Sequence, residues 1–141
     1  MNIPIKPLER LEVSNDSLID ANRWRLAHTY HRTRQNVHFQ SLSQPGIVSG
    51  LGVVPIEAPK PVSQAYRDGR WLEIQPGLAI DSQGNPIVVP EAMPIRIASS
   101  VIEDAPLEIY LTLAYVDPDE LEGIAEQEFV TETFRIQERQ T

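Results

Sequence analysis

Apolar and polar positions change their spacing near residue 45, and this change divides the chain into a helical front and a β-rich remainder. Residues 21–42 contain no Gly or Pro, and apolar side chains of one broad face recur there at intervals of three to five residues, apart from a gap of seven between Tyr30 and Val37. This broad face consists of Trp24, Ala27, Tyr30, Val37 and Leu42. Asp20 stands where a helix N-cap accepts free amide hydrogens of the first turn. The pattern predicts one long helix over residues 20–43, ended by Gln44-Pro45-Gly46 because the residue before a proline disfavours helical geometry.

Residues 1–19 are predicted to form an extended N-terminal arm. Pro4 and Pro7 interrupt any helix in this stretch. Leu8, Leu11 and Val13 are spaced so that they could touch a neighbouring surface.

Residues 44–141 are predicted to form a small β module, because short apolar runs alternate with turn residues. In the longest run, 107–116, a leucine or isoleucine stands at every second position from 107 to 113, so these side chains lie on one face of the predicted strand. The expected strands are 47–56 (one or two short strands), 71–74, 78–80, 87–89, 95–97, 107–116 and 129–136. We therefore expect an α+β fold, with one long N-terminal helix packed on a small antiparallel β-sandwich or barrel. An end soon after a strand predicts that the module continues in a longer chain.

Two Pro-Gly corners, Pro45-Gly46 and Pro76-Gly77, each lead into an apolar run of this module. Gly50 and Gly52, behind the first corner, indicate a bulge or a close backbone approach. Asp81 opens a turn, where its side chain would bond the local backbone. The positions expected to act through backbone geometry are Pro45, Gly46, Gly50, Gly52, Pro76, Gly77, Asp81 and Gly84.

Composition narrows the class of protein. The 12 prolines favour short strands, turns and extended connections over further helices. The chain has no cysteine, which excludes disulfides and thiolate–metal sites. We see neither a signal-peptide pattern in residues 1–10 nor an apolar run long enough to cross a bilayer.

Charge is unevenly distributed along the chain. Residues 1–70 hold nine Lys/Arg and six Asp/Glu, a net charge of +3, whereas the remainder holds three and 14, a net charge of −11. A solvated acidic surface is one interpretation, and head-to-tail complementarity between subunits is the other.

The predicted helix carries the residues most suited to a contact surface. We expect a subunit interface at Arg23, Arg25, His28, Arg32, Arg34 and His38. His28 and His31 have the i, i+3 spacing of a metal pair, but a zinc site would need ligands from elsewhere. The arginines could contact phosphates, although the acidic remainder of the chain would repel a nucleic acid. Pairing with carboxylates of this chain or a neighbouring subunit is the preferred interpretation, without metal or nucleic acid.

The sequence offers no set of catalytic residues. Gly50-Leu51-Gly52 lacks the third glycine and the following helix of a dinucleotide loop, and Ser49 is not in a nucleophile elbow. The acidic residues of 117–127 do not match a calcium-binding loop, and Pro118 interrupts them. No group of residues combines a nucleophile, a base and an oxyanion donor. We expect neither an enzyme nor a cofactor.

The order of these motifs resembles a known family. The relevant segments are Tyr30-His31-Arg32-Thr33-Arg34, His38, Pro45-Gly46-Ile47-Val48-Ser49-Gly50-Leu51, Pro76-Gly77-Leu78-Ala79-Ile80-Asp81, Gly84 and Ile87. Together they resemble proteins found with phage-tail-like contractile injection systems, and the small β modules of phage baseplate and tail-fibre attachment proteins. Two positions depart from that pattern: Leu42-Ser43-Gln44 stands where a His-Gly pair is common, and Ser49 where a Cys is common.

The resemblance implies a structural or adaptor subunit of a contractile, phage-tail-like particle, at its baseplate or a fibre attachment point, with no catalytic residues. Its partners would be other protein subunits, in many copies and with symmetry. The particle would be cytoplasmic, either free or docked on a membrane through other subunits. The alternative is a carbohydrate- or ligand-binding β module that uses Tyr66 and Trp71, because aromatic side chains on β modules can stack on sugars.

Overall fold

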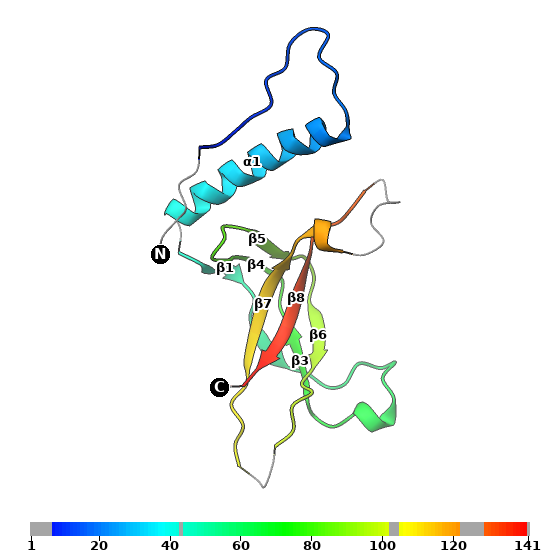
Figure 1. The fold of residues 1–141 in the computed structure, drawn as a ribbon. Coiled ribbons are helices and arrows are strands. Elements are labelled where there is room, and N and C mark those ends of the chain that lie inside the picture. The colour runs from blue at the N-terminus through cyan, green and yellow to red at the C-terminus, as the bar shows by residue number, and fades with distance from the viewer. Residues whose placement is uncertain (1–6, 43, 102–104, 122–128, 141) are drawn as a thin grey trace.

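The computed structural model describes residues 7–42, 44–101, 105–121 and 129–140. It confirms an α+β fold, in which one helix leads into a module of antiparallel strands (Figure 1). The elements are α1 (Ala21–Leu42), β1 (Gly46–Gly50), β2 (Val53–Pro55), β3 (Trp71–Ile74), β4 (Gly77–Ile80), β5 (Pro86–Val89), β6 (Met93–Arg96), β7 (Tyr110–Val116) and β8 (Thr133–Arg139), with short 3-10 turns η1 (Gln64–Tyr66) and η2 (Pro118–Glu120).

Helix α1 begins where its cap predicts. The Oδ1 atom of Asp20 accepts a hydrogen bond of 2.8 Å from the backbone N–H of Arg23, which satisfies one of the free amides of the first turn. Residues 7–19 precede it without helix or strand, apart from a turn at Asn15 and Asp16. The hydroxyls of Ser14 and Ser17 meet at 2.8 Å beside this turn.

The six short strands form two three-stranded antiparallel sheets, β1-β4-β5 and β2-β3-β6, built from the same three chain segments; we refer to the two together as the bent sheet. β1 and β2 pair with β4 and β3, which in turn pair with β5 and β6. Two backbone hydrogen bonds carry the first pairing across the bend: Leu51 N–H to Pro76 O at 3.2 Å, and Gln75 N–H to Gly52 O at 2.8 Å. The six short strands are therefore three longer strands, each folded near its middle.

Close backbone contact makes this bend. Gly50 is opposite Gly77 in the ladder, and Gly50 and Leu51 both have left-handed backbone, with φ of 65° and 60°. A Cβ atom on Gly50 would meet Pro76 O and lie 2.9 Å from Gly77 Cα. The close approach predicted for Gly50 is confirmed, whereas Gly52 has room for a Cβ and the ladder irregularity lies between Ile47 and Ser49.

The β7–β8 hairpin packs over the inner face of the bent sheet. Five side chains are buried there: Leu51, Ile74, Ala79, Ile87 and Val89. The hairpin contributes Leu113, Tyr115, Phe134 and Ile136 as partly buried partners, and β6 contributes Ile95. The core is thin, and it lies between the sheet and the hairpin. The predicted sandwich or barrel is not confirmed, since the described strands form three separate sheets.

Several strand ends differ from the prediction. β6 occupies 93–96 rather than 95–97, and Pro94 lies within it because β6 is an edge strand of its ladder, where a missing N–H is tolerated. β7 begins at Tyr110, three residues later than expected, and β8 runs over 133–139 rather than 129–136. Phe129 is therefore not in the strand and is exposed. Of the expected acidic loop, 118–120 form η2, and 122–127 lie outside the described residues.

The loop between β2 and β3 is held to β6 by charge. The Nε atom of Arg96 donates to Asp68 Oδ2 at 3.1 Å, and a second guanidinium nitrogen bonds the same oxygen. These hydrogen bonds lower the pKa of Asp68, although some burial opposes them. Gly69 follows with φ of 74°, the left-handed backbone that lets the chain turn here.

Glu138 joins β8 to the segment after β6. Its carboxylate accepts hydrogen bonds from the Ala98 N–H at 2.6 Å, the Ser99 N–H at 3.1 Å and the Ser99 hydroxyl at 2.7 Å. Burial raises the pKa of Glu138, but these hydrogen bonds outweigh it, so that the pKa lies below its usual value of 4.5.

Because the folded state lowers this pKa, Glu138 stabilises the fold above its usual pKa, and that contribution is lost as the pH falls through the folded value. We expect Glu138→Gln to lose less of its thermal stability than the wild type between about pH 5 and pH 3. Thermal unfolding followed by circular dichroism measures both proteins, with Glu132→Gln, on the exposed approach to β8, as control. An equal loss in all three proteins would contradict the role given to Glu138.

Candidate functional site

The outer face of α1 carries a continuous stripe of side chains. Positions 24, 28, 31, 35, 38 and 42 recur at intervals of three and four residues, so they lie above one another on one side of the helix. The stripe consists of Trp24, His28, His31, Gln35, His38 and Leu42, and all six side chains are exposed. Within it, the Trp24 and His28 rings meet edge to face, with centroids 5.6 Å apart. We refer to these six residues as the outer stripe.

The opposite face of α1 touches the β module through polar groups. The side-chain amides of Asn36 and Asn85 meet at 2.9 Å, and Gln40 Nε2 donates to Gln83 O at 2.5 Å. Both contacts lie at the turn between β4 and β5 (Figure 1). No side chain of α1 is buried. The helix therefore docks on the module by its second half without contributing to the core.

A polar cleft of about 570 Å³ lies between α1 and the module. A guanidinium nitrogen of Arg32 lies 3.6 Å from the Asp117 carboxylate across it. Tyr115 also lines the cleft. Burial, followed by the charges of Glu132 and Asp117, raises the pKa of Tyr115, so the phenol is neutral at physiological pH. The arrangement ties the helix to the residue that precedes η2.

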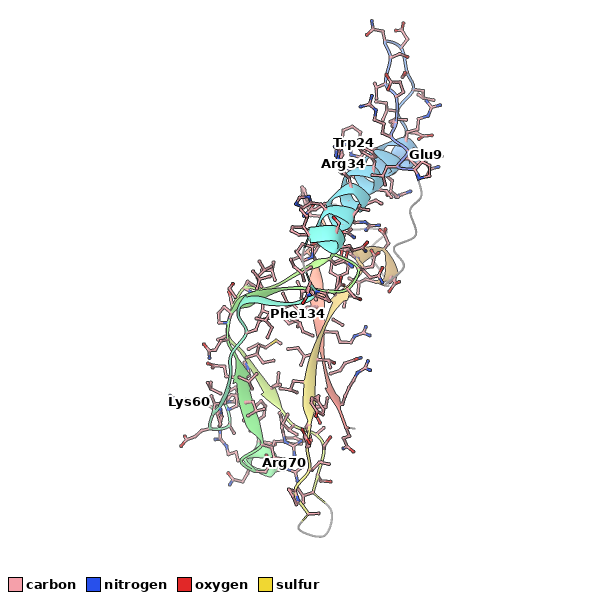
Figure 2. All side chains as sticks on the ribbon, turned by 90° about the vertical axis from the view of Figure 1, so that its left-hand side faces the viewer. Glu9, Trp24, Arg34, Lys60, Arg70 and Phe134 are labelled. Atoms are coloured by element: carbon pink, nitrogen blue, oxygen red, sulfur yellow. The ribbon has the colours of Figure 1, made fainter. Side chains whose placement is uncertain are left out.

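Arginines border the outer stripe on both sides. Arg25 and Arg32 follow one edge and Arg23 and Arg34 the other, and no Asp or Glu lies between residues 21 and 42. Their bonds are local: Arg25 donates to Asn22 Oδ1 at 3.1 Å, Arg34 to the Tyr30 hydroxyl at 2.8 Å, and Arg23 to Leu18 O. The guanidinium groups thus remain at the surface around an aromatic and imidazole centre, as Figure 2 shows for Trp24 and Arg34.

The structure places five of the six predicted interface residues on or beside the outer stripe and turns the sixth toward the module. His28 and His38 belong to the outer stripe, Arg23, Arg25 and Arg34 border it, and Arg32 turns toward Asp117. Sequence reasoning missed His31 and Gln35 as stripe members. It also grouped Tyr30 and Val37 with Trp24 and Leu42, whereas the helical positions place Val37 beside Asn36 and Gln40, toward the module. The three-to-four spacing from 24 to 42 was the signal that would have found the stripe.

The other predicted chemistry finds little support in geometry. Among the described residues, no cluster of three or more His, Asp or Glu side chains is arranged to hold a metal ion. Trp71 is half-buried and its indole N–H donates to Tyr66 O at 2.7 Å, while the Arg96 guanidinium covers the Tyr66 ring at 5.1 Å. A sugar that stacked on this face of Tyr66 would have to displace Arg96.

The predicted turn positions act as expected around Asp81. Its carboxylate accepts from the N–H groups of Gln83 at 2.9 Å and Asn85 at 2.8 Å, and Gly84 adopts φ of 83°. Pro76-Gly77 meets Gly50 at the bend, whereas Pro45-Gly46 lies at the other end of the β1–β4 ladder, where Gly46 faces Ile80. The two Pro-Gly corners thus serve different joints of the module.

A scan against models of known protein families and a search of curated proteins both return no match to this chain. No helix in the part of the chain that the structure describes is both long and apolar enough to cross a membrane.

Proposed function

We propose that this chain is a structural adaptor that joins neighbouring protein subunits through the outer stripe of α1. The observation that carries the proposal is an exposed helix face with Trp24 at one end, three histidines along it, and arginines on both edges, of which Arg32 alone pairs with an acid of the module, Asp117. Aromatic side chains and arginine are enriched in protein interfaces, where aromatic groups fill the centre. Trp24 is 59% exposed, which is a large apolar surface to leave in water.

The charge of this face selects the class of partner. Residues 21–42 carry four arginines and no carboxylate, so an acidic surface complements them. An anionic nucleic acid would meet the same arginines, but the −11 charge of residues 71–141 opposes it. An acidic protein surface is therefore the partner that we propose.

We place this adaptor in a contractile, phage-tail-like particle, at the baseplate or a fibre attachment point and in several copies. The support is the order of motifs described above: the capped helix with Tyr30-His31-Arg32, then the two Pro-Gly corners and the Asp81 turn. The particle would be cytoplasmic, whether free or docked on a membrane by its other subunits.

Affinity purification of the tagged chain from its own cells tests the proposal. We expect sheath, tube or spike proteins to copurify, and Arg25→Glu/Arg34→Glu to reduce their recovery at least tenfold, since reversed charge repels an acidic partner. Arg135→Glu/Arg139→Glu, which makes the same charge change on exposed positions of β8, is the matched control. A monodisperse monomer that never copurifies with such proteins would exclude the particle.

A further inference from the structure

Among the described strands the β7–β8 hairpin forms no ladder with the bent sheet, so a seam lies on each side of the hairpin. The Glu138 bonds to Ala98 and Ser99 hold β8 beside the end of β6, while β7 lies on the other side of the hairpin, toward β1 and β2 (Figure 1). Among the described strands, β7 pairs with β8 alone, β1 with β4 and β2 with β3. The seam between β7 and the β1–β2 segment therefore has unpaired backbone on both sides, which Figure 2 views from the open side.

An apolar groove of about 450 Å³ fills this seam. It is lined on one side by Ile47 and Val53 and on the other by Leu111 and Leu113. Ile47 and Val53 pair with Ala79 and Ile74, which are core residues, and side chains of paired residues share a face. Yet Ile47 is 67% exposed and Val53 is 47% exposed. These two core-facing side chains are thus uncovered at this seam.

The chemistry of the seam defines what can occupy it. Strand edges present backbone N–H and C=O groups that an added extended segment can pair. Because side chains alternate along a strand, such a segment needs apolar residues at every second position to face the groove, with polar residues between them.

The N-terminal arm contains such a segment. Residues 9–13 have no Gly or Pro, and Leu11 and Val13 alternate with Arg10 and Glu12. Val13 is 57% exposed. Within the described residues, no hydrogen bond or ion pair joins 7–19 to the β module. The chain therefore carries both an open apolar seam and a segment with the matching pattern, in which Val13 is exposed and Leu11 is half-buried.

Chain length indicates which copy supplies the segment. α1 has 22 residues and spans about 33 Å, and β1 follows its far end (Figure 1). Val13 is seven residues before Asp20, so it reaches at most about 24 Å from the start of the helix. Val13 of the same chain therefore cannot reach the far end of α1, after which β1 begins, whereas Val13 of another copy has no such limit.

We propose that residues 9–13 of a second copy insert as a strand between β7 and the β1–β2 segment, with Leu11 and Val13 filling the groove. Reciprocal exchange closes a dimer, and one-way exchange builds a chain of subunits. The inference concerns contacts between copies of this chain alone, so it does not depend on the proposed particle or on the outer stripe.

Disulfide trapping tests it, because the chain has no cysteine of its own. One preparation carries Val13→Cys and a mass tag, and the other carries Ile47→Cys. After mixing and mild oxidation, we expect the mixed disulfide to form at least tenfold more than with Val88→Cys, whose side chain is 58% exposed on the other face of β5. Equal yields for the two partners would overturn the proposal, as would bonding found only within single chains that carry both Val13→Cys and Ile47→Cys.

Self-association of the full chain gives an independent measurement. We expect sedimentation to show concentration-dependent association that Val13→Asp weakens at least tenfold, since a carboxylate cannot enter the apolar groove. Leu18→Asp, at an exposed arm position outside 9–13, should leave it unchanged. If neither variant weakened association, the arm insertion would be overturned, but the outer stripe could still be an interface. Conversely, if the Arg25/Arg34 variant lost partner binding, the self-association measured here would be unaffected.

Discussion

Replacing Gly77 with alanine should lower the free energy of unfolding by about 3 kcal/mol, at the upper end of the usual cost of overpacking. Gly77 has no positive φ, so the expected cost is steric. A Cβ atom there would meet Ser49 O, and it would lie 2.5 Å from Leu51 N and 2.8 Å from the Leu51 Cγ atom. Two of these neighbours are backbone atoms at the bend, which cannot rotate away. Chemical denaturation of the purified chain measures the change.

Gly52→Ala is the matched control for this substitution. Gly52 lies on the other side of the same bend, and its Cβ would be 3.6 Å from the nearest atom, a flexible Gln75 side chain. We expect this variant to change stability by less than about 1 kcal/mol. Similar losses in the two variants would mean that the bend does not depend on the contact between Gly77 and β1.

Replacing Gly84 with alanine should separate α1 from the β module. Gly84 lies in the turn after Asp81, and its Cβ would meet Asn36 O and lie 3.0 Å from two other backbone atoms of Asn36. Since the helix contributes nothing to the buried core, it can shift without unfolding the module. The movement would break the contact of Asn36 with Asn85 and that of Gln40 with Gln83.

Spin labels on cysteines introduced at Leu26 and Val88 measure this movement in an otherwise cysteine-free chain. Their distance distribution should be narrow in the parent chain and broad with Gly84→Ala. Gly69→Ala is the control, because Gly69 has a similar φ of 74° but open space around it. The Gly69→Ala variant carries the same cost of about 1 kcal/mol for a left-handed backbone, but its Cβ atom meets no neighbouring atom. Equal broadening in both variants would mean that the left-handed backbone of the turn, and not the collision with Asn36, causes the movement of α1.

The sequence predicted those elements of the fold that depend on contacts between residues close together in the chain. The helix and its cap at Asp20 depend on neighbouring residues, and both are confirmed. The strand at 71–74 and the turn at 81–85 are confirmed for the same reason. The end of β8 could not be read this way, because Glu138 is held by Ala98 and Ser99, about 40 residues away in the chain.

The candidate site was predicted only in part. Its residue types were visible in the sequence, because four arginines and three histidines fall within one acid-free helix. Which face they occupy depends on where the module touches the helix, at Asn36 and Gln40. The open seam was not predictable, since it requires the position of β7 relative to β1, and these strands are about 60 residues apart.

The two outer edges of the bent sheet are protected differently against aggregation. β6 contains Pro94, which lacks the N–H that another strand would need, whereas β1, from Gly46 to Gly50, contains no proline and no charge. An unprotected edge beside the exposed Ile47 and Val48 is a template for misassembly when no native strand covers it. A charged residue in place of Val48 should therefore raise the soluble yield of the overproduced chain.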